Sequence, residues 1–512
     1  MKPSPEWFDR YGFATVFVVA VLLRIVAVIL SRGYMASDDQ FQTVSVAYRW
    51  LQQGLLDAQG HLTWTLEPSS EISRFPLYTL SLYVLMYAYK MIGVTSLDTM
   101  MYGIRAAQAA LSLLGVWAVY RIILLSTRSA KWATVGGLIM AAHFAMPFLS
   151  VRNLIEFTGG TLWAWALYYL YLNRDHYSQR ALFIAGIISG LAWAIRFQVL
   201  FAFWVVPFVL LFEYRRLKPA LVYCLGVLAV MLAAGFVDWW LLGRFMASSI
   251  NHVAQGLSEG AVYNTSAFIY LAVILGFFIP PASIIFFVPA FRRSFWSRHR
   301  ILVVSTLAFI LIHAFLPSRM ERYMLPVIPA LVLILVLSWY ELMKQGSLRA
   351  VWRKLSLGAA LFAAVVNLAL LIPFTTNYGH KGMVEPLVRA SDLKASPEVL
   401  FVTPEQSRFF PLVYGDRVGL RRKYLHKWSD IQAVARDSSF LQRLDYLIVY
   451  PEQPENLGRF RDSLTRYFGP LKQEFVVQPS LVDRFLHRMN PSHNHLEAAW
   501  VYALDRRLVL PD

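Results

Sequence analysis

The chain has 512 residues, of which 57% are hydrophobic and only 15% charged, with a mean hydropathy of +0.48. Soluble domains carry about 25% charged residues, so this composition excludes a soluble protein and predicts one built into a membrane. The formal net charge of +17 must then be concentrated where the chain leaves the membrane. One cysteine, Cys224, excludes a disulfide framework, a cysteine-rich zinc site and dithiol redox chemistry.

Apolar runs that approach the roughly 20 residues needed to cross a bilayer as a helix recur as far as residue 373. They predict eleven spans, at 12–33, 100–124, 132–149, 158–173, 181–197, 199–212, 219–237, 266–290, 301–316, 324–342 and 355–373. A twelfth run, 76–93, opens with proline, is rich in tyrosine and carries Lys90, so it either spans the membrane or only dips into it. No small-residue cleavage site follows Arg32, which favours a retained first span over a signal peptide.

Basic residues gather in six segments, each separated from the next by two predicted spans. These segments carry Lys2 and Arg10; Arg121, Arg128 and Lys131; Arg174 and Arg180; Arg215, Arg216 and Lys218; Arg292, Arg293, Arg298 and Arg300; and Lys344, Arg349, Arg353 and Lys354. Because Lys and Arg of short loops stay in the cytoplasm, all six lie inside only if 76–93 does not cross. We therefore predict a membrane-dipping helix there, a cytoplasmic N-terminus, and an outer location for everything after the last span.

The sequence changes character at about residue 374. Short apolar runs at 399–402, 446–450, 475–477 and 500–503 alternate with polar, helix-like stretches. This pattern predicts a small extracytoplasmic α/β domain at 374–512, following a transmembrane module at 1–373 whose first outer segment, 34–98, holds interfacial helices. The expected fold class is a polytopic α-helical membrane protein with a small C-terminal α/β domain.

The first outer segment carries an acidic pair, Asp38 and Asp39, just after the first span. An apolar stripe from Phe41 to Leu55 predicts a helix lying in the interface behind it. The pair is explained either as a solvated helix cap or as a carboxylate placed to accept a proton from an incoming hydroxyl.

Later outer loops carry cations at membrane depth, where charges are costly and usually functional. Arg152 and Glu156 stand at i and i+4, which fits a surface ion pair of a few tenths of a kcal/mol or a functional pair. Arg196 and Gln198 lie between two closely spaced spans, and no acid stands near Arg196 in the sequence.

The last short outer loop is Leu316 to Pro326, with Arg319, Glu321, Arg322 and Tyr323 between two apolar spans. Arg and Tyr are common interfacial anchors. Two arginines beside one glutamate also suggest a phosphate clamp, because a guanidinium matches phosphate oxygens in bidentate geometry.

In order and rough spacing, these four segments resemble the motifs of GT-C glycosyltransferases, and most closely those of the mannosyltransferases that use dolichol-phosphate mannose. The family's H-P-D-E-x-F-Q resembles Ala36 to Gln42, its R-x-x-x-E resembles Arg152 to Glu156, its R-P-T resembles Arg196 to Gln198, and its H-K-E-x-R-F-x-x-P resembles Ser318 to Pro326. The histidine and proline of the first motif are replaced by Ala36 and Ser37. The resemblance extends over about residues 1–340.

The resemblance implies inverting transfer of a sugar, mannose or a related hexose or pentose, from a polyprenyl-monophosphate donor, with Asp38 as general base and no metal or other cofactor. Physical chemistry agrees, since outer-face arginines can stabilise charge on a leaving lipid phosphate. We expect Asp39 to be a second, acceptor-positioning carboxylate. Phosphate ligands are then Arg196, Arg319 and Arg322, and acceptor or structural support comes from Arg152, Glu156, Gln198, Glu321 and Tyr323.

Two other functions remain open on the sequence: a lipid or amphiphile transporter or flippase, and a non-catalytic membrane scaffold. The expected partners are membrane lipid, the lipid-linked sugar donor and a glycan or glycolipid acceptor, with no nucleic acid. A bacterial plasma membrane with a periplasmic active site is favoured over the endoplasmic reticulum, because only one glycosylation-type triplet occurs, at Asn264.

Overall fold

The computed structural model describes residues 5–35, 39–63, 72–173, 178–258, 266–316, 319–344, 350–394, 397–403, 411, 413–416, 421–450, 457–489, 491 and 497–504. The chain forms two compact units, each described here by itself. The first contains Met1–Ile29, Arg49–Gly93 and Met101–Thr375, and the second contains Leu30–Tyr48, Val94–Met100 and Thr376–Asp512.

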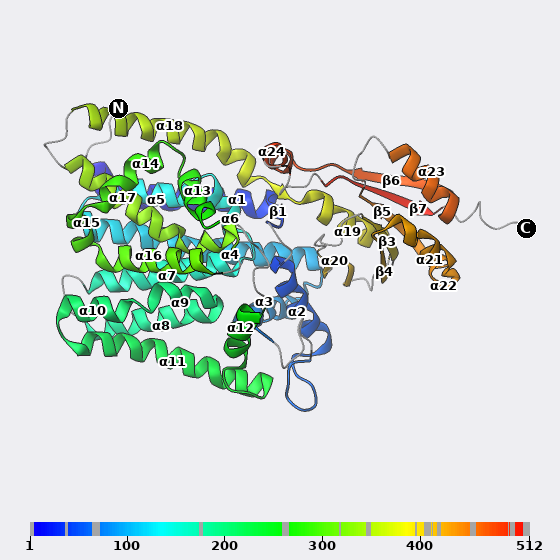
Figure 1. The fold of residues 1–512 in the computed structure, drawn as a ribbon, viewed down its shortest axis with the longest axis horizontal. Coiled ribbons are helices and arrows are strands. Elements are labelled where there is room, and N and C mark those ends of the chain that lie inside the picture. Colours follow the sequence, from blue (N-terminus) through cyan, green and yellow to red (C-terminus); the bar gives the residue numbers. More distant parts are fainter. Residues whose placement is uncertain are drawn as a thin grey trace, which may run out of the picture. The chain divides into compact units, whose positions relative to one another are not determined.

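The first unit is a helical bundle (Figure 1). Its first helices are α1 (Pro5–Leu30), α3 (Leu77–Met91), α4 (Leu97–Thr127), α5 (Ala130–Ala142), α6 (Ala145–Ser150), α7 (Ile155–Leu172) and α8 (Gln179–Ile195). The middle of the chain adds η1 (Phe197–Val199), α9 (Leu200–Phe203), α10 (Val206–Tyr214), α11 (Leu217–Leu242) and α12 (Ala247–Ser258). The last part adds α13 (Phe268–Phe277), α14 (Ala282–Phe287), η2 (Val288–Phe291), α15 (Arg293–Arg298), α16 (Arg300–Phe315), η3 (Glu321–Val327), α17 (Ile328–Lys344) and α18 (Ala350–Thr375).

Each of the eleven apolar runs coincides with one helix or with two or three neighbouring helices. Within the described residues, six helices are long and apolar enough to cross a membrane, or seven if a bent pair counts as one span. That pair lies in the predicted span 266–290, where the chain bends by 103° between α13 and α14. Proline lacks a backbone N–H and disrupts helices, which accounts for a break at Pro280 and Pro281. The number of eleven crossings stays a prediction.

Helices α1 and α4 run antiparallel. Phe13 near the start of α1 packs on Tyr120 near the end of α4, with ring centroids 5.2 Å apart. Further along α1, the Arg24 guanidinium donates to Ser112 Oγ at 2.8 Å and to the Ala141 carbonyl at 2.9 Å. Because α1 and α4 run in opposite directions, the segment that connects them starts and ends at the same end of the helical bundle. This is the arrangement that a dipping helix α3 requires, and it gives buried Arg24 a structural role.

The helices differ in how much of their surface other helices cover. In α17, 83% of the most apolar window is buried, against 17% in α18 and 22% in α1. The exposed surfaces of α1, α11 and α18 consist of large apolar side chains, as expected for helices in contact with lipid. Helices α8 and α11 pack at glycines: a Cβ on Gly186 would lie 2.1 Å from the Tyr223 carbonyl oxygen, which is the close approach that small residues permit between membrane helices.

The second unit holds a five-stranded mixed sheet in the order β4-β3-β5-β7-β6. Its strands are β3 (Glu398–Val402), β4 (Arg421–Leu425), β5 (Leu444–Val449), β6 (Leu471–Val477) and β7 (Ala499–Leu504). The other elements are β1 (Arg32–Gly33), α2 (Asp39–Gln53, which ends in the first unit), β2 (Tyr378–Gly379), α19 (Lys381–Leu393), α20 (Val413–Asp416), η4 (Trp428–Asp430), α21 (Ile431–Arg436), α22 (Ser438–Leu441), α23 (Leu457–Phe468) and α24 (Leu481–Met489). The sheet confirms an α/β fold. All four predicted strands are present, while β4, with three basic residues at the sheet edge, was not predicted.

The segments that follow α1 and α18 meet in this second unit. Strand β1 pairs in parallel with β2, so that Gly33 lies opposite Gly379. Gly33 has a φ of +76°, and a Cβ placed on it would lie 1.8 Å from the Gly379 carbonyl oxygen. Next to this contact, the Tyr34 ring stacks on His380 at 4.4 Å, and His380 Nδ1 lies 3.0 Å from Glu497 Oε2. The acidic segment that is predicted to carry the base therefore follows directly after a strand whose backbone pairs with residues that come after α18.

We expect the Gly33→Ala substitution to destabilise this contact. The left-handed φ costs an L-residue about 1–2 kcal/mol, and the forced overlap adds about 1–3 kcal/mol. Gly93→Ala is the matched control, because Gly93 has a φ of +83° but nothing within 4 Å of its Cβ position. Thermal unfolding followed by tryptophan fluorescence should show a larger loss for Gly33→Ala; equal losses would contradict the close β1–β2 approach.

Candidate active site

A buried carboxylate at the start of α7 organises the candidate site. Glu156 lies in the first turn of α7 and is only 3% exposed. A negative charge is favourable there, because the N-terminus of a helix carries partial positive charge. Glu156 Oε1 lies 3.5 Å from Arg196 Nη2 and 3.9 Å from Arg322 Nε. One carboxylate thus pairs with arginines from two loops that are far apart in the sequence.

Local structure explains why these arginines reach Glu156. Arg196 ends α8 and has extended backbone, which turns the chain into η1. Gly159 and Gly160 lie on α7 just beyond Glu156. A Cβ on Gly160 would lie 2.8 Å from the Pro326 carbonyl oxygen, so glycine lets η3 approach α7. Arg322 is the second residue of η3.

Tyr323 lies against both arginines. Its ring centroid is 5.2 Å from the Arg196 guanidinium carbon and 5.9 Å from that of Arg322. Such cation–π contacts stabilise each cation by about 0.5–1 kcal/mol or more. Four of the predicted site residues, Glu156, Arg196, Arg322 and Tyr323, therefore come together.

A third arginine, Arg74, belongs to the same cluster and was not predicted. Arg74 and Arg322 are both close enough to Arg196 to repel its charge, whereas Glu156 attracts it. Arg74 and Arg196 line a small cavity together with Gln198 and His252. Within the described residues, the Glu156 carboxylate therefore faces two arginines, and a third lies beside Arg196.

The segment that carries Arg74 is held in place by α12. Asn251 Nδ2 donates to the Ile72 carbonyl at 3.0 Å, and His252 Nδ1 lies 3.1 Å from the Ser73 carbonyl. On the other side of the ring, Gln198 Nε2 lies 3.1 Å from His252 Nε2. The His252 ring is therefore held on both sides, by the segment that carries Arg74 and by Gln198. The predicted supporting role of Gln198 thus has a structural partner.

A buried polar network lies beside Glu156. Gln108 Nε2 donates to the Tyr78 hydroxyl at 2.8 Å, and that hydroxyl donates to Asn153 Oδ1 at 2.6 Å. Thr158 Oγ1 donates to Gln108 Oε1 at 3.2 Å. The network links α3, α4 and α7, so it holds the dipping helix against the site. Isolated polar residues on apolar helices were its signal in the sequence.

The ion pair that the sequence spacing allowed differs from the one that the structure shows. Arg152 precedes α7, its guanidinium carbon lies 4.2 Å from the Phe148 ring centroid, and no ion pair joins these described residues Arg152 and Glu156. The i, i+4 helical pair therefore does not form. Arg196, which has no acid near it in the sequence, pairs with Glu156.

The last outer loop also differs from the predicted clamp. The carboxylate beside Arg322 is Glu156, whereas Glu321 is exposed. Arg319 Nη1 donates to the Ala314 and Leu316 carbonyls at 3.3 and 3.0 Å, and so caps the end of α16. A phosphate-binding role for Arg319 stays a prediction.

The acidic pair is only partly described. Asp38 lies outside the described residues, and Asp39 is the first residue of α2, with its side chain outside the description. In the described part of the chain, no group of three or more His, Cys, Asp or Glu side chains could hold a metal ion. Metal independence stays a prediction.

Comparison with known proteins defines the class. The family model of the Alg9-like mannosyltransferases matches residues 15–399. The chain belongs to this family, and is thus a membrane glycosyltransferase of the GT-C type. No curated protein matches the chain significantly.

Two solved structures share the fold. ArnT from Cupriavidus metallidurans bound to undecaprenyl phosphate has a TM-score of 0.54 at 15% identity, with 98% of this chain and 100% of that chain covered. AglB from Archaeoglobus fulgidus in complex with an inhibitory peptide and a dolichol-phosphate has a TM-score of 0.50 at 12% identity, covering 92% and 74%. At these identities the likeness is one of fold.

We expect Glu156→Gln to be strongly destabilising, because it leaves buried cations without their counter-charge. Removing one partner of a buried pair costs about 3–5 kcal/mol. Asp462→Asn is the matched control, since Asp462 and its partner Arg461 have side chains that are 75% and 55% exposed, and exposed pairs contribute about 0–1 kcal/mol. Thermal unfolding of both variants measures the difference; a loss for Glu156→Gln no larger than for the control would contradict the role of Glu156.

Proposed function

We propose that the protein transfers a sugar, mannose or a related hexose or pentose, from a polyprenyl-monophosphate donor to a glycan or lipid-linked acceptor on the outer face of the membrane. The observation that carries this proposal is the pairing of Arg196 and Arg322 with the buried carboxylate of Glu156, with Arg74 beside Arg196. Membership of the mannosyltransferase family supports the sugar. The ArnT fold, seen with undecaprenyl phosphate, supports the lipid donor.

The geometry of Arg196 suits a phosphate ligand. Its 3.5 Å distance from Glu156 is longer than a charge-assisted hydrogen bond of about 2.7–2.9 Å. Glu156 therefore holds the guanidinium by charge while N–H groups stay available to a second anion. A phosphate in this partly buried place would accept hydrogen bonds from those N–H groups and be attracted by the neighbouring guanidinium of Arg322.

The proposed reaction is a single displacement with inversion. The acceptor hydroxyl oxygen attacks the anomeric carbon of the sugar and forms the new glycosidic bond. The bond from that carbon to the phosphate oxygen breaks, and its electron pair leaves with the polyprenyl phosphate. The hydroxyl proton passes to the Asp38 carboxylate. Negative charge grows on the leaving phosphate, where Arg196 and Arg322 stabilise it more in the transition state than in the bound donor.

Asp39 is proposed to orient the acceptor, and the outer face is proposed to be the periplasmic side of a bacterial plasma membrane. The basic loops support this orientation, since four of the six predicted cytoplasmic segments line neighbouring cavities at one end of the first unit. No metal or other cofactor takes part in the proposed reaction.

Substitution of the two neighbouring carboxylates tests the general base and the supporting group separately. Asp38→Asn should lower kcat by 100-fold or more, in line with the roughly 10²–10⁴-fold contribution of general base catalysis. Asp39→Asn should mainly raise the acceptor KM. Transfer of labelled sugar from a polyprenyl phosphate by the purified protein measures both. Unchanged kcat in Asp38→Asn would remove it as the base.

Substitution of the two arginines that pair with Glu156 tests the binding of the donor. Arg196→Gln and Arg322→Gln should each reduce kcat/KM for the donor by about 100-fold or more, the usual effect of losing one donor to a developing negative charge. Arg180→Gln, an exposed residue of α8, is the control for expression and folding. Mass spectrometry of lipid that co-purifies with the wild type should find a polyprenyl phosphate, which the two variants retain less. Full retention in both would contradict the phosphate site.

A further inference from the structure

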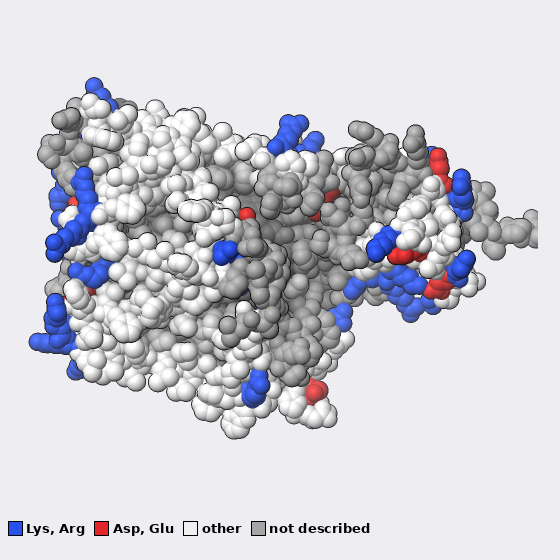
Figure 2. All heavy atoms as spheres, in the orientation of Figure 1, with Lys and Arg blue, Asp and Glu red and all other residues white. Residues whose placement is uncertain are grey.

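Basic residues from four loops converge at the end of the first unit that is remote from the candidate active site. Figure 2 shows Lys and Arg gathered at this end, where α10 and α15 lie in Figure 1. We define the basic pocket by five side chains that line two neighbouring cavities there: Arg128, Arg215, Arg298, Arg300 and Lys344. The cavities share Tyr171, Arg298 and His299. A surplus of positive charge in loops suffices to orient a membrane protein, but it does not require a cavity.

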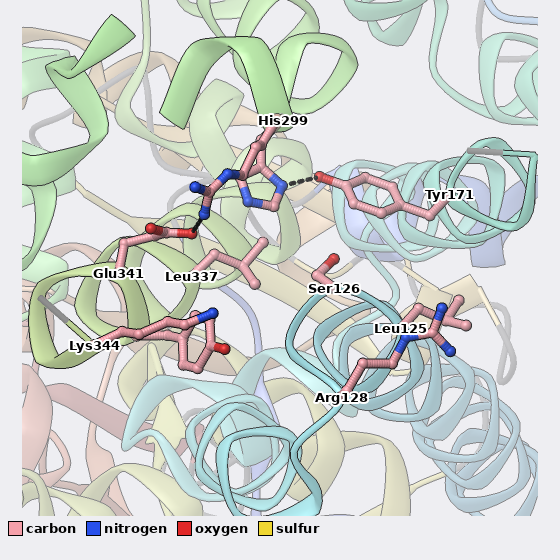
Figure 3. A pocket seen from close by; sticks show the side chains of 10 residues that line it. Leu125, Ser126, Arg128, Tyr171, His299, Leu337, Glu341 and Lys344 are labelled. Carbon is pink, nitrogen blue, oxygen red and sulfur yellow. Dashed lines mark hydrogen bonds and ion pairs between the residues drawn. The ribbon is translucent and has the colours of Figure 1, made fainter. Parts of the chain in front are cut away.

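The wall shared by the two cavities is rigid. Figure 3 shows Tyr171 joined to His299, and the Tyr171 hydroxyl lies 3.0 Å from His299 Nδ1. Both side chains are buried. On the neighbouring wall, the Tyr340 hydroxyl donates to the Thr127 carbonyl at 3.4 Å, and Trp132 packs edge-on against the Tyr340 ring at 5.7 Å. The first cavity, of about 210 Å³, is therefore formed before any ligand arrives.

Aromatic rings hold the cations at the rim. The guanidinium carbons of Arg215 and Arg300 lie 4.8 and 4.4 Å from the centroid of the same Phe212 ring. Lys344 Nζ lies 5.7 Å from the Tyr340 ring centroid. Because these side chains are already ordered, less conformational entropy is lost when a ligand binds.

The charge of the described residues leaves room for an anion. Two carboxylates line the cavities: Glu341 pairs with Arg298, and Glu213 lies 3.8 Å from Arg300. Five cations against two carboxylates leave a surplus of three positive charges. Basic pockets between membrane helices on the cytoplasmic side suit anionic lipid headgroups.

We propose that the basic pocket binds a phosphate group, supplied by the headgroup of an anionic phospholipid in the adjoining membrane leaflet. Arginine contributes paired N–H donors to the phosphate oxygens, and lysine contributes a point charge. The basic pocket is separate from the proposed donor site, because Leu170 and Tyr171 near the last turn of α7 line the pocket, whereas Glu156 lies in the first turn of α7. A bound headgroup there would anchor α10, α16 and α17 to one another.

The test compares two double variants of the full chain in detergent. Arg215→Gln with Lys344→Gln removes two pocket cations that have no ion pair to a described carboxylate. Lys218→Gln with Arg293→Gln removes the same charge from the same end, at exposed positions outside the pocket. Thermal shifts are titrated with short-chain phosphatidylglycerol, with short-chain phosphatidylcholine and with inorganic phosphate at constant ionic strength.

Phosphatidylglycerol should stabilise the wild type, and the pocket variant should bind it about 25-fold more weakly, at roughly fivefold per cation. The control variant should bind as the wild type does. A shift with phosphatidylglycerol alone identifies lipid as the source, and an equal shift with inorganic phosphate identifies free phosphate. Equal weakening in both variants, or in neither, would overturn the proposal. If the double variant does not fold, Lys344→Gln alone should bind about fivefold more weakly, and unchanged binding would overturn it.

Discussion

The balance of charge around Glu156 is the interaction on which the candidate site depends. A charged side chain is costly in a membrane unit unless it is paired, and this carboxylate pairs with cations from the ends of α8 and η3. The start of α7 favours the negative charge, and Gly160 lets η3 come close enough for the pair to form. The same guanidinium groups are the ones proposed to bind the donor phosphate.

Among the described residues of the first unit, basic side chains gather in two places. At one end, they line the basic pocket. At the other end, arginines lie beside a buried carboxylate and a polar network that includes Tyr78 and Gln108. The second unit adds a backbone contact between the segments after α1 and after α18, from which the acidic segment starts.

Much of the fold could be predicted from the sequence, because a membrane imposes long apolar runs and backbone pairing within each helix. Periodicity also predicted a helix where α2 forms, and short apolar runs predicted four strands of the second unit. Strand β4 was missed since Arg421, Arg422 and Lys423 are typical of a solvated loop, and only its place at the sheet edge makes a basic strand possible. The bend between α13 and α14 follows from two prolines, but its size of 103° depends on packing.

The sequence by itself determined the class of protein, since hydrophobicity, charge and motif order are local properties. Tertiary structure decided the partners. The i, i+4 spacing allowed an ion pair between Glu156 and Arg152, yet Glu156 pairs with Arg196 and Arg322. Arg74 gave no signal at all, because its role depends on hydrogen bonds from α12 that bring its segment beside Arg196. Electrostatic energy depends on distance in space, and only folding sets those distances.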